Sequence, residues 1–183
     1  MVPGKIHSRA LRLLLGVALV LALEGLSGGG PRLGELPQAW HDDRGLAVAL
    51  NAHLGRPLVL TMAYASCHRI CPATIGALKK LQAELDARGT RADFVIVGYD
   101  PAHDDAASWR RYRALHHLDR TNWSFLGGSR EDTERLARAL GFEFWNYDEH
   151  VMHDSRVVLF DASGRLVAAA DPARPGWAAA FWG

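Results

Sequence analysis

The sequence predicts an α/β domain built on a mixed β-sheet with helices packed against it. Strand-like apolar segments alternate with amphipathic helical segments between residues 56 and 141, which is the pattern of parallel strands joined by helical crossovers. Two further strand-like segments, joined by a short glycine turn, end the apolar pattern and add antiparallel strands. The chain has 183 residues, 49% of them hydrophobic, so it is long enough to bury a core of its own.

The domain is expected to begin with a hairpin and a central strand. Asp42, Asp43 and Gly45 are turn-forming residues between apolar flanks, and they predict an N-terminal hairpin that starts near Trp40. The segment "RPLVLTMAY" (56–64) is almost continuously apolar. A run of this length and composition is typical of a strand that is covered on both faces.

A helix is predicted directly after this strand, over residues 72–88. Pro72 suits the first turn of a helix, and Gly89 suits its C-terminal end. Apolar residues recur at spacings of three and four, which places them on one face of the helix: Ile75, Leu78, Leu81 and Leu85.

The alternation of strand and helix then repeats. The segment 92–100 reads as a second buried strand and 104–118 as a helix, while 123–128 is a short strand or loop. The next helix, 129–141, has Ser129 and Asp132 in the positions of a capping box and Gly141 as its stop.

The end of the domain combines one ambiguous segment with a predicted hairpin. Residues 141–153 are rich in aromatic side chains and are compatible with an inserted strand and a loop, but their periodicity does not decide between them. The strands 155–161 and 165–171 are joined by a short turn.

The N-terminal segment has the composition of an export signal. Residues 1–27 combine a cationic start with a short apolar run, and they predict a signal peptide or a membrane anchor. Residues 28–38 are rich in glycine and proline and predict a linker, so the folded domain spans 39–183. We therefore expect an extracytoplasmic domain, on the periplasmic side, either secreted or held at the membrane by an uncleaved anchor.

The charge of the chain argues against nucleic-acid binding. Without Lys5, Arg9, Arg12 and Glu24 of the N-terminal segment, 18 basic residues face 19 acidic ones. No basic surface is expected from this balance, and nucleic acid is excluded as a partner.

The chain has only two cysteines, Cys67 and Cys71, and they lie where the central strand passes into the first helix. The positive end of a helix stabilises thiolates, which favours both nucleophilic attack and metal binding. From the residues alone, the pair is a structural disulfide, a redox couple or a soft metal site. Zinc usually takes four Cys or His ligands, whereas copper accepts two sulfurs supplemented by imidazole, so copper fits the available ligands better.

Three blocks of sequence together resemble the Sco/SenC family of copper-binding, thioredoxin-like proteins. They are "YASCHRICPATIGALKKL", "VIVGYDPAHDD" and "MHDSRVVLFDASGRLV", and the similarity covers roughly residues 40–171. The resemblance implies a thioredoxin-like fold and one copper ion, Cu(I) or Cu(II), bound by Cys67, Cys71 and His153. Ordinary thioredoxins have a cis-proline opposite their cysteines, and this chain has His153 at the corresponding place, which favours metal binding over general disulfide exchange.

By the same resemblance, the protein is expected to be a metallochaperone that serves assembly of the dinuclear CuA centre of cytochrome c oxidase. Its partners would be the oxidase subunit that carries the CuA site, other copper carriers and thiol reductants. The alternative hypothesis is an enzyme, an extracytoplasmic thiol-disulfide oxidoreductase, in which Cys67 and Cys71 are the redox-active pair and Cys67 attacks. Under a third hypothesis the pair is only a structural disulfide.

Other polar or soft side chains near these blocks are given smaller roles. His68, between the cysteines, is expected to face solvent or tune the thiols, and Met152 is expected to fill the core. The Asp-Pro pair, Asp100 and Pro101, is expected to support the site, and we assign no paired-carboxylate chemistry to Asp100 and Asp104.

The chain departs from the family pattern in two places. "HRI" stands between the cysteines where a proline and an acidic residue are expected, so the thiol pKa values should fall further. The tail after Asp171 is too short for the family's usual terminal helix, so that either one sheet face is less covered or the aromatic tail covers it.

Overall fold

The computed structural model describes residues 30–65, 71–147 and 150–181 of the chain. Contacts group Pro31–Gly183 into one compact unit. Its core is a seven-stranded mixed sheet with helices on both faces, which confirms the predicted α/β class.

The sheet has the strand order β2-β1-β5-β4-β3-β8-β9. Strands β3, β4 and β5 run parallel to one another, and the remaining neighbours pair antiparallel. Every residue of β3 and β4 is buried, as the continuous apolar runs predicted. The strands are β1 (Trp40–Asp42), β2 (Ala47–Val48), β3 (Leu58–Ala63), β4 (Asp93–Gly98), β5 (Trp123–Gly128), β8 (Val157–Phe160) and β9 (Leu166–Ala170).

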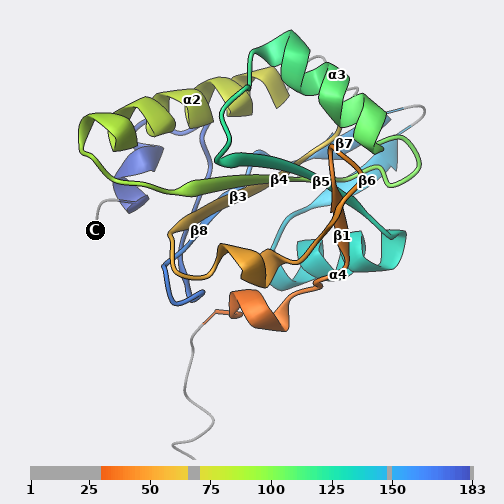
Figure 1. The fold of residues 1–183 in the computed structure, drawn as a ribbon, viewed down its shortest axis with the longest axis horizontal. Coiled ribbons are helices and arrows are strands. Elements are labelled where there is room, and N and C mark those ends of the chain that lie inside the picture. Colours follow the sequence, from red (N-terminus) through yellow and green to blue (C-terminus); the bar gives the residue numbers. More distant parts are fainter. Residues whose placement is uncertain (1–29, 66–70, 148–149, 182–183) are drawn as a thin grey trace, which may run out of the picture. The chain divides into compact units, whose positions relative to one another are not determined.

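Helices cover the two faces of this sheet (Figure 1). The helices α2 (Cys71–Ala87) and α3 (Ala106–His116) lie over one face. The other face carries α4 (Arg130–Leu140) and the short 3-10 helices η2 (Leu33–Glu35) and η3 (Leu50–His53).

The helix ends follow from the capping residues. The Ser129 side chain accepts a hydrogen bond from the Asp132 N–H and begins α4, as predicted, and Gly141 ends it with a positive φ of 70°. Asp105 caps α3 in the same way, through the N–H of Ser108. The sequence placed the start of this helix slightly early, at residue 104.

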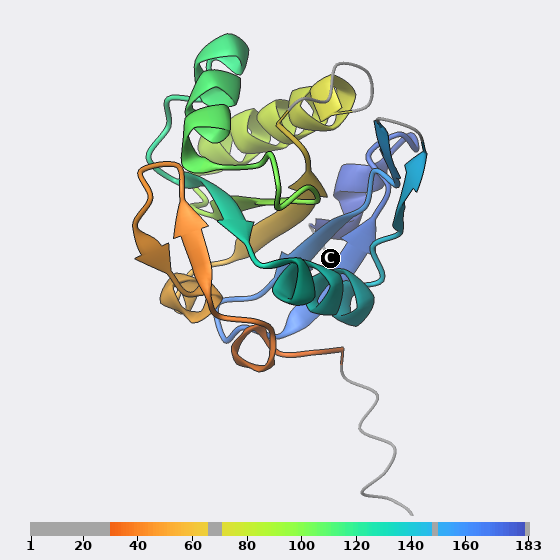
Figure 2. The same ribbon diagram turned by 90° about the vertical axis from the view of Figure 1, so that its right-hand side faces the viewer.

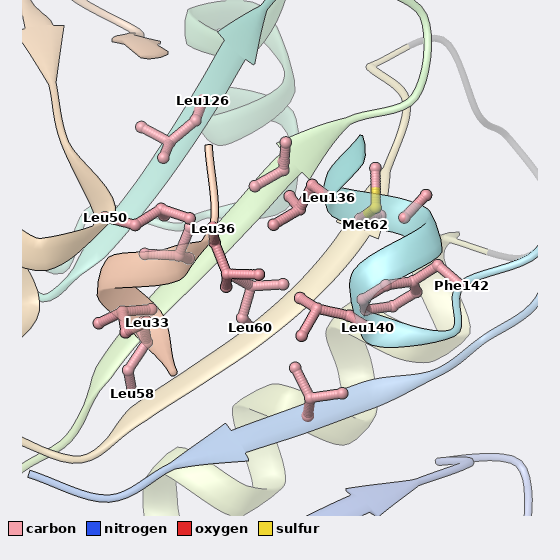
Figure 3. Close-up of a cluster of buried hydrophobic side chains, with 14 of the residues drawn as sticks. Leu33, Leu36, Leu50, Leu58, Leu60, Met62, Leu126, Leu136, Leu140 and Phe142 are labelled. Carbon is pink, nitrogen blue, oxygen red and sulfur yellow. The ribbon is translucent and has the colours of Figure 1, made fainter. Parts of the chain in front are cut away.

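Each face of the sheet has its own apolar core. Figure 3 shows the first core, in which leucines of η2, η3 and β3 pack against Leu136 and Leu140 of α4. The second core joins α2 and α3 to the opposite face and includes the stacked rings of Phe94 and Trp123, whose centroids lie 4.8 Å apart. Both faces of the sheet are therefore buried, and this burial of apolar surface is the main favourable contribution to folding.

The N-terminal hairpin is confirmed as β1 and β2. The carboxylate of Asp42 closes its turn by accepting hydrogen bonds from the N–H groups of Arg44 and Leu46. The Trp40 ring lies against β5 at Gly128, where a Cβ atom would approach the ring to 2.5 Å. A glycine is needed there because any larger residue would displace the buried indole.

The segment that the sequence left ambiguous forms a second hairpin. Strands β6 (Phe144–Tyr147) and β7 (His150–His153) pair antiparallel in a separate two-stranded sheet. The hairpin precedes β8, so β7 ends close to the main sheet.

The tail after Asp171 forms a short 3-10 helix, η4 (Trp177–Phe181), in place of a longer terminal helix. Trp177, Ala178 and Phe181 pack against the second core. The aromatic tail therefore contributes to covering the sheet face shared with α2.

The predicted segment of residues 1–27 lies outside the described residues. Within the described residues, no helix has the length and apolar character needed to cross a membrane.

Leu60, at the centre of β3, gives a direct test of this packing. Its side chain is 0% exposed, and Leu60→Ala should lower the free energy of unfolding by about 2–5 kcal/mol because the cavity cannot fully collapse. Leu115→Ala, at a side chain that is 68% exposed on α3, should change it by less than about 0.5 kcal/mol. Urea unfolding of the reduced protein measures both; equal losses would contradict the assigned core.

Candidate metal centre

The sheet brings the predicted ligand His153 close to the residues that precede the cysteines. Strands β3 and β4 are parallel, so the residues after both strands lie at one edge of the sheet. Strand β8 is antiparallel to β3, with Val157 opposite Thr61, so the residues before β8 lie at that same edge. In Figures 1 and 2, the first turn of α2 and the β6–β7 hairpin lie toward the same end of the sheet.

The two predicted cysteine ligands are described to different extents. Cys71 is the first residue of α2, as expected from the sequence. Cys67 and His68 lie in the segment 66–70, outside the described residues. Among the residues that the structure does describe, no three His, Cys, Asp or Glu side chains are grouped so that they could hold a metal ion.

His153 ends β7 and is only 7% exposed. Its ring contacts Tyr64, three residues before Cys67, edge to face with centroids 5.6 Å apart. On another side it packs on Tyr99, the residue after β4, at 4.8 Å. The imidazole is thus held between residues that follow two central strands.

A backbone contact fixes the tautomer of this imidazole. The Nδ1 atom of His153 lies 2.5 Å from the carbonyl oxygen of Asp154. Because a carbonyl can only accept a hydrogen bond, Nδ1 carries the proton in the neutral ring and Nε2 carries the lone pair. Nε2 is then the ring nitrogen with the lone pair that metal binding requires.

Tyr99 and Asp154 form the support around His153. The Tyr99 hydroxyl donates to Asp154 at 3.3 Å, and the N–H of Glu143 donates to the other carboxylate oxygen at 3.3 Å. Burial raises the pKa of Asp154, while these hydrogen bonds and Arg156 oppose the shift. The sequence did not point to Tyr64, Tyr99 or Asp154 as site residues, because single aromatic or acidic residues carry no spacing signal of their own.

The expectation that Met152 fills the core is wrong. Met152 is 38% exposed, and it lies opposite Trp145, itself 55% exposed, across the hairpin. Neighbouring residues on a strand point to opposite faces, so Met152 points away from the side on which His153 is buried.

An open groove borders His153. It has a volume of about 700 Å³ and is lined by His153, the residues that lead into β8, the end of β9 and the tail up to Trp177. A partner can therefore approach the neighbourhood of this histidine from solvent.

Residues 99–105, which connect β4 to α3, form the Asp-Pro loop. Asp104 in this loop is hydrogen-bonded to Ala65, the first residue of the segment 65–71 that contains both cysteines and is called the cysteine segment below. The Asp104 side chain is 3% exposed and accepts hydrogen bonds from the N–H groups of Ala65, at 2.7 Å, and Asp100, at 2.8 Å. Burial raises the pKa of Asp104 to about 7; those two N–H groups and His103 oppose the shift, and the charge of Asp100 adds to it. This role of Asp104 was not predicted from the sequence.

Sequence comparison identifies a family and a copper-related relative. The chain matches the SCO1/SenC family over residues 37–180. It is 28% identical over 118 residues to a Stutzerimonas stutzeri protein whose name describes it as a candidate copper-binding protein. The match covers 61% of this chain and 56% of that relative, so this chain spans little more than half of the relative's length.

Comparison with solved structures supports the fold. BsSco is described as a member of the Sco family of cytochrome c oxidase assembly proteins, with a disulfide switch. Its structure matches this chain with a TM-score of 0.69 and 21% sequence identity. The match covers 78% of this chain and 84% of BsSco. Arabidopsis thaliana ScoI with copper bound matches with a TM-score of 0.67 and 21% identity, covering 78% and 87%. The chain therefore has the thioredoxin-like fold of these proteins.

The buried carboxylate of Asp104 predicts a pH-dependent stability. Its folded pKa of about 7 exceeds the ordinary value of 3.8, so its contribution is fully present below about pH 4 and is lost as the pH rises through 7, by at most on the order of 4 kcal/mol. Asp104→Asn should therefore lose less free energy of unfolding than the wild type between pH 5 and pH 8.

Asp161→Asn is the matched control for this measurement. Hydrogen bonds from the Ser163 side chain and the Arg165 N–H lower the pKa of Asp161, so its contribution changes only below about pH 4. Urea unfolding at several pH values should give parallel curves for Asp161→Asn and the wild type above pH 5. A parallel curve for Asp104→Asn would contradict the assigned burial of that charge.

Proposed function

The chain belongs to the SCO1/SenC family, and on that premise we propose that it is a copper metallochaperone that binds one copper ion through Cys67, Cys71 and His153. The ion is its cargo, delivered during assembly of the CuA centre of cytochrome c oxidase. The recipient is the oxidase subunit that carries this centre, and other copper carriers load the protein.

The position of His153 is the observation that carries this proposal. Its ring packs on Tyr64, three residues before Cys67, and the Asp154 carbonyl leaves the lone pair on Nε2. This tautomer suits an imidazole that binds a metal through Nε2, and the ring lies next to the residue that leads into the cysteine segment.

The ligand types suit copper. Two thiolates are soft donors that bind Cu(I), and an imidazole nitrogen is a good ligand for Cu(II), so this set can hold either oxidation state. Cys71 begins α2, and the positive end of a helix favours the thiolate form that metal binding requires. The chain has no further cysteine for a four-coordinate structural zinc site.

The proposed place of action is the extracytoplasmic side of a membrane. The cationic start and apolar run of residues 1–27 suit an export signal or anchor, and residues 28–38 suit a linker to the domain 39–183. The groove beside His153 then provides a surface from which a membrane-bound recipient can approach.

A titration of the reduced protein with Cu(I) and Cu(II) tests the proposal. The wild type should bind one equivalent tightly, and Cu(II) should give a sulfur charge-transfer band. His153→Ala removes a ligand, so it should weaken binding by at least the roughly 10- to 100-fold that loss of a supporting group costs, and it should shift this band. Cys67→Ser should abolish the band.

His41→Ala is the matched control, because His41 is an exposed histidine on β1, which lies three strands away from β3 in the sheet. It should bind copper as the wild type does. A wild-type protein that binds no Cu(I) at one equivalent, or a His153→Ala variant with unchanged affinity and spectrum, would overturn the proposed ligand set.

The second candidate is a thiol-disulfide oxidoreductase. It rests on the same cysteines at the start of a helix, and a disulfide switch is identified in the structurally similar BsSco. In this alternative Cys67 attacks a substrate disulfide, and the metal is incidental.

Turnover of a model disulfide separates the two candidates. If the cysteines serve copper, the wild type should reduce the disulfide slowly, and His153→Ala should change the rate as the environment of the thiolates changes. A fast wild-type reaction that proceeds at the same rate in His153→Ala would favour the oxidoreductase. If Cys67→Ser lowers the stability but changes neither copper binding nor disulfide reduction, the cysteines form only a structural disulfide.

A further inference from the structure

We propose that Asp104 is a positioning residue of the metal centre, whose carboxylate holds the start of the cysteine segment against the Asp-Pro loop. The inference rests on the proposed function, because it concerns how the same cysteines are arranged. The Oδ1 atom accepts the N–H of Ala65, two residues before Cys67, and Oδ2 accepts the N–H of Asp100. One side chain therefore connects two segments that are 35 residues or more apart in the chain.

The Asp-Pro loop is a rigid partner for this connection. The Asp104 N–H donates to the Asp100 carbonyl at 2.7 Å, and the Asp100 N–H donates to the Asp104 carboxylate at 2.8 Å, so the two residues close the loop reciprocally. The N–H of His103 also donates to the Asp100 carbonyl, and the Asp100 carboxylate lies 2.7 Å from Nδ1 of His103. Directly after Asp104, Asp105 starts α3, which anchors the loop to the second core.

The neighbouring strands leave space for Asp104 at two glycines, one beside its side chain and one beside its backbone carbonyl. A Cβ atom on Gly98, at the end of β4, would lie 2.6 Å from Oδ2 and 2.7 Å from the Cβ of Asp104. A Cβ atom on Gly127, in β5, would lie 2.5 Å from the Asp104 carbonyl oxygen. Both glycines are needed because the Asp104 residue approaches both strands so closely.

A carboxylate meets this geometry where an amide does not. Two N–H donors point at the side chain, and an ionised carboxylate offers an acceptor to each. Asparagine has the same shape but offers one acceptor oxygen, so its NH₂ group would face one of the two donors. Burying a carboxyl group at a 3% exposed position is unfavourable unless it is hydrogen-bonded, and its two backbone N–H partners indicate a geometric role.

The test compares Asp104→Asn with Asp42→Asn. Asp42 is the matched control: it is 5% exposed and also accepts two backbone N–H bonds, but in the β1–β2 hairpin at the sheet edge. The first readout is the equilibrium of the cysteine pair with glutathione at pH 8, in which oxidised glutathione forms one protein disulfide and releases two reduced glutathione molecules. The second readout is Cu(I) affinity, measured by competition with a chelator.

In Asp104→Asn the disulfide equilibrium constant should shift roughly tenfold or more, as expected when a charge-assisted hydrogen bond that holds Ala65 in place is lost. Cu(I) affinity should fall as well, and Asp42→Asn should stay within about twofold of the wild type in both readouts. An unchanged equilibrium in Asp104→Asn, or equal shifts in the two variants, would overturn the positioning role.

Gly98→Ala is a second variant that keeps the Asp104 carboxylate but pushes it from its place. It should shift the glutathione equilibrium in the same direction as Asp104→Asn, whereas Gly34→Ala, where a Cβ meets nothing within 4 Å, should not. Absence of a shift in Gly98→Ala would also count against the inference. Because the glutathione readout needs no metal, a wild type that fails to bind copper would refute the proposed function and leave this test intact.

Discussion

The antiparallel pairing of β8 with β3 is the constraint on which the candidate centre depends. With Val157 opposite Thr61, the chain must enter β8 at the edge where β3 ends. Only three residues lie between His153 and Val157, which leaves the imidazole little freedom, and its ring lies against Tyr64. If β8 ran parallel to β3, His153 would lie at the opposite end of the strands. It could not then bind the same metal ion as the cysteines.

The rigidity of this edge comes from the two cores. Strands β3 and β4 are buried on both faces, so the residues that follow them are held by packing. Tyr99 illustrates the consequence: it is 1% exposed, it contacts Phe142, Phe144 and His153, and its hydroxyl reaches Asp154. Tyr99 is therefore part of the apolar core and at the same time supports the ring of His153.

Much of the fold was predictable because its signals are local. The apolar run 56–64, the helical spacing from Ile75 to Leu85 and the capping residue Ser129 each act within one element, and the structure confirms them. The β6–β7 hairpin was not predictable from the periodicity of its residues, and in the described structure its strands pair only with each other. The exposure of Met152 followed from that hairpin and was missed for the same reason.

The candidate ligands could be named from the three blocks of sequence, but their support could not. Tyr64 and Asp154 act through pairings that join segments far apart in the chain, and Asp104 reads in the sequence as an ordinary loop carboxylate before a helix. Its burial becomes visible only when Gly98 and Gly127 are seen to make room for it.

That arrangement places a buried carboxyl group beside the residues that lead to Cys67. Burial raises the pKa of Asp104 to about 7, so the fold is less stable above this pH, where the group is ionised, than in acid. What the charge provides is a pair of acceptors for Ala65 and Asp100, and with them a fixed path for the chain into the cysteine segment. Under the proposed function the protein binds copper and also releases it, and contacts of this kind offer a way to tune the proposed ligand set without altering the ligands themselves.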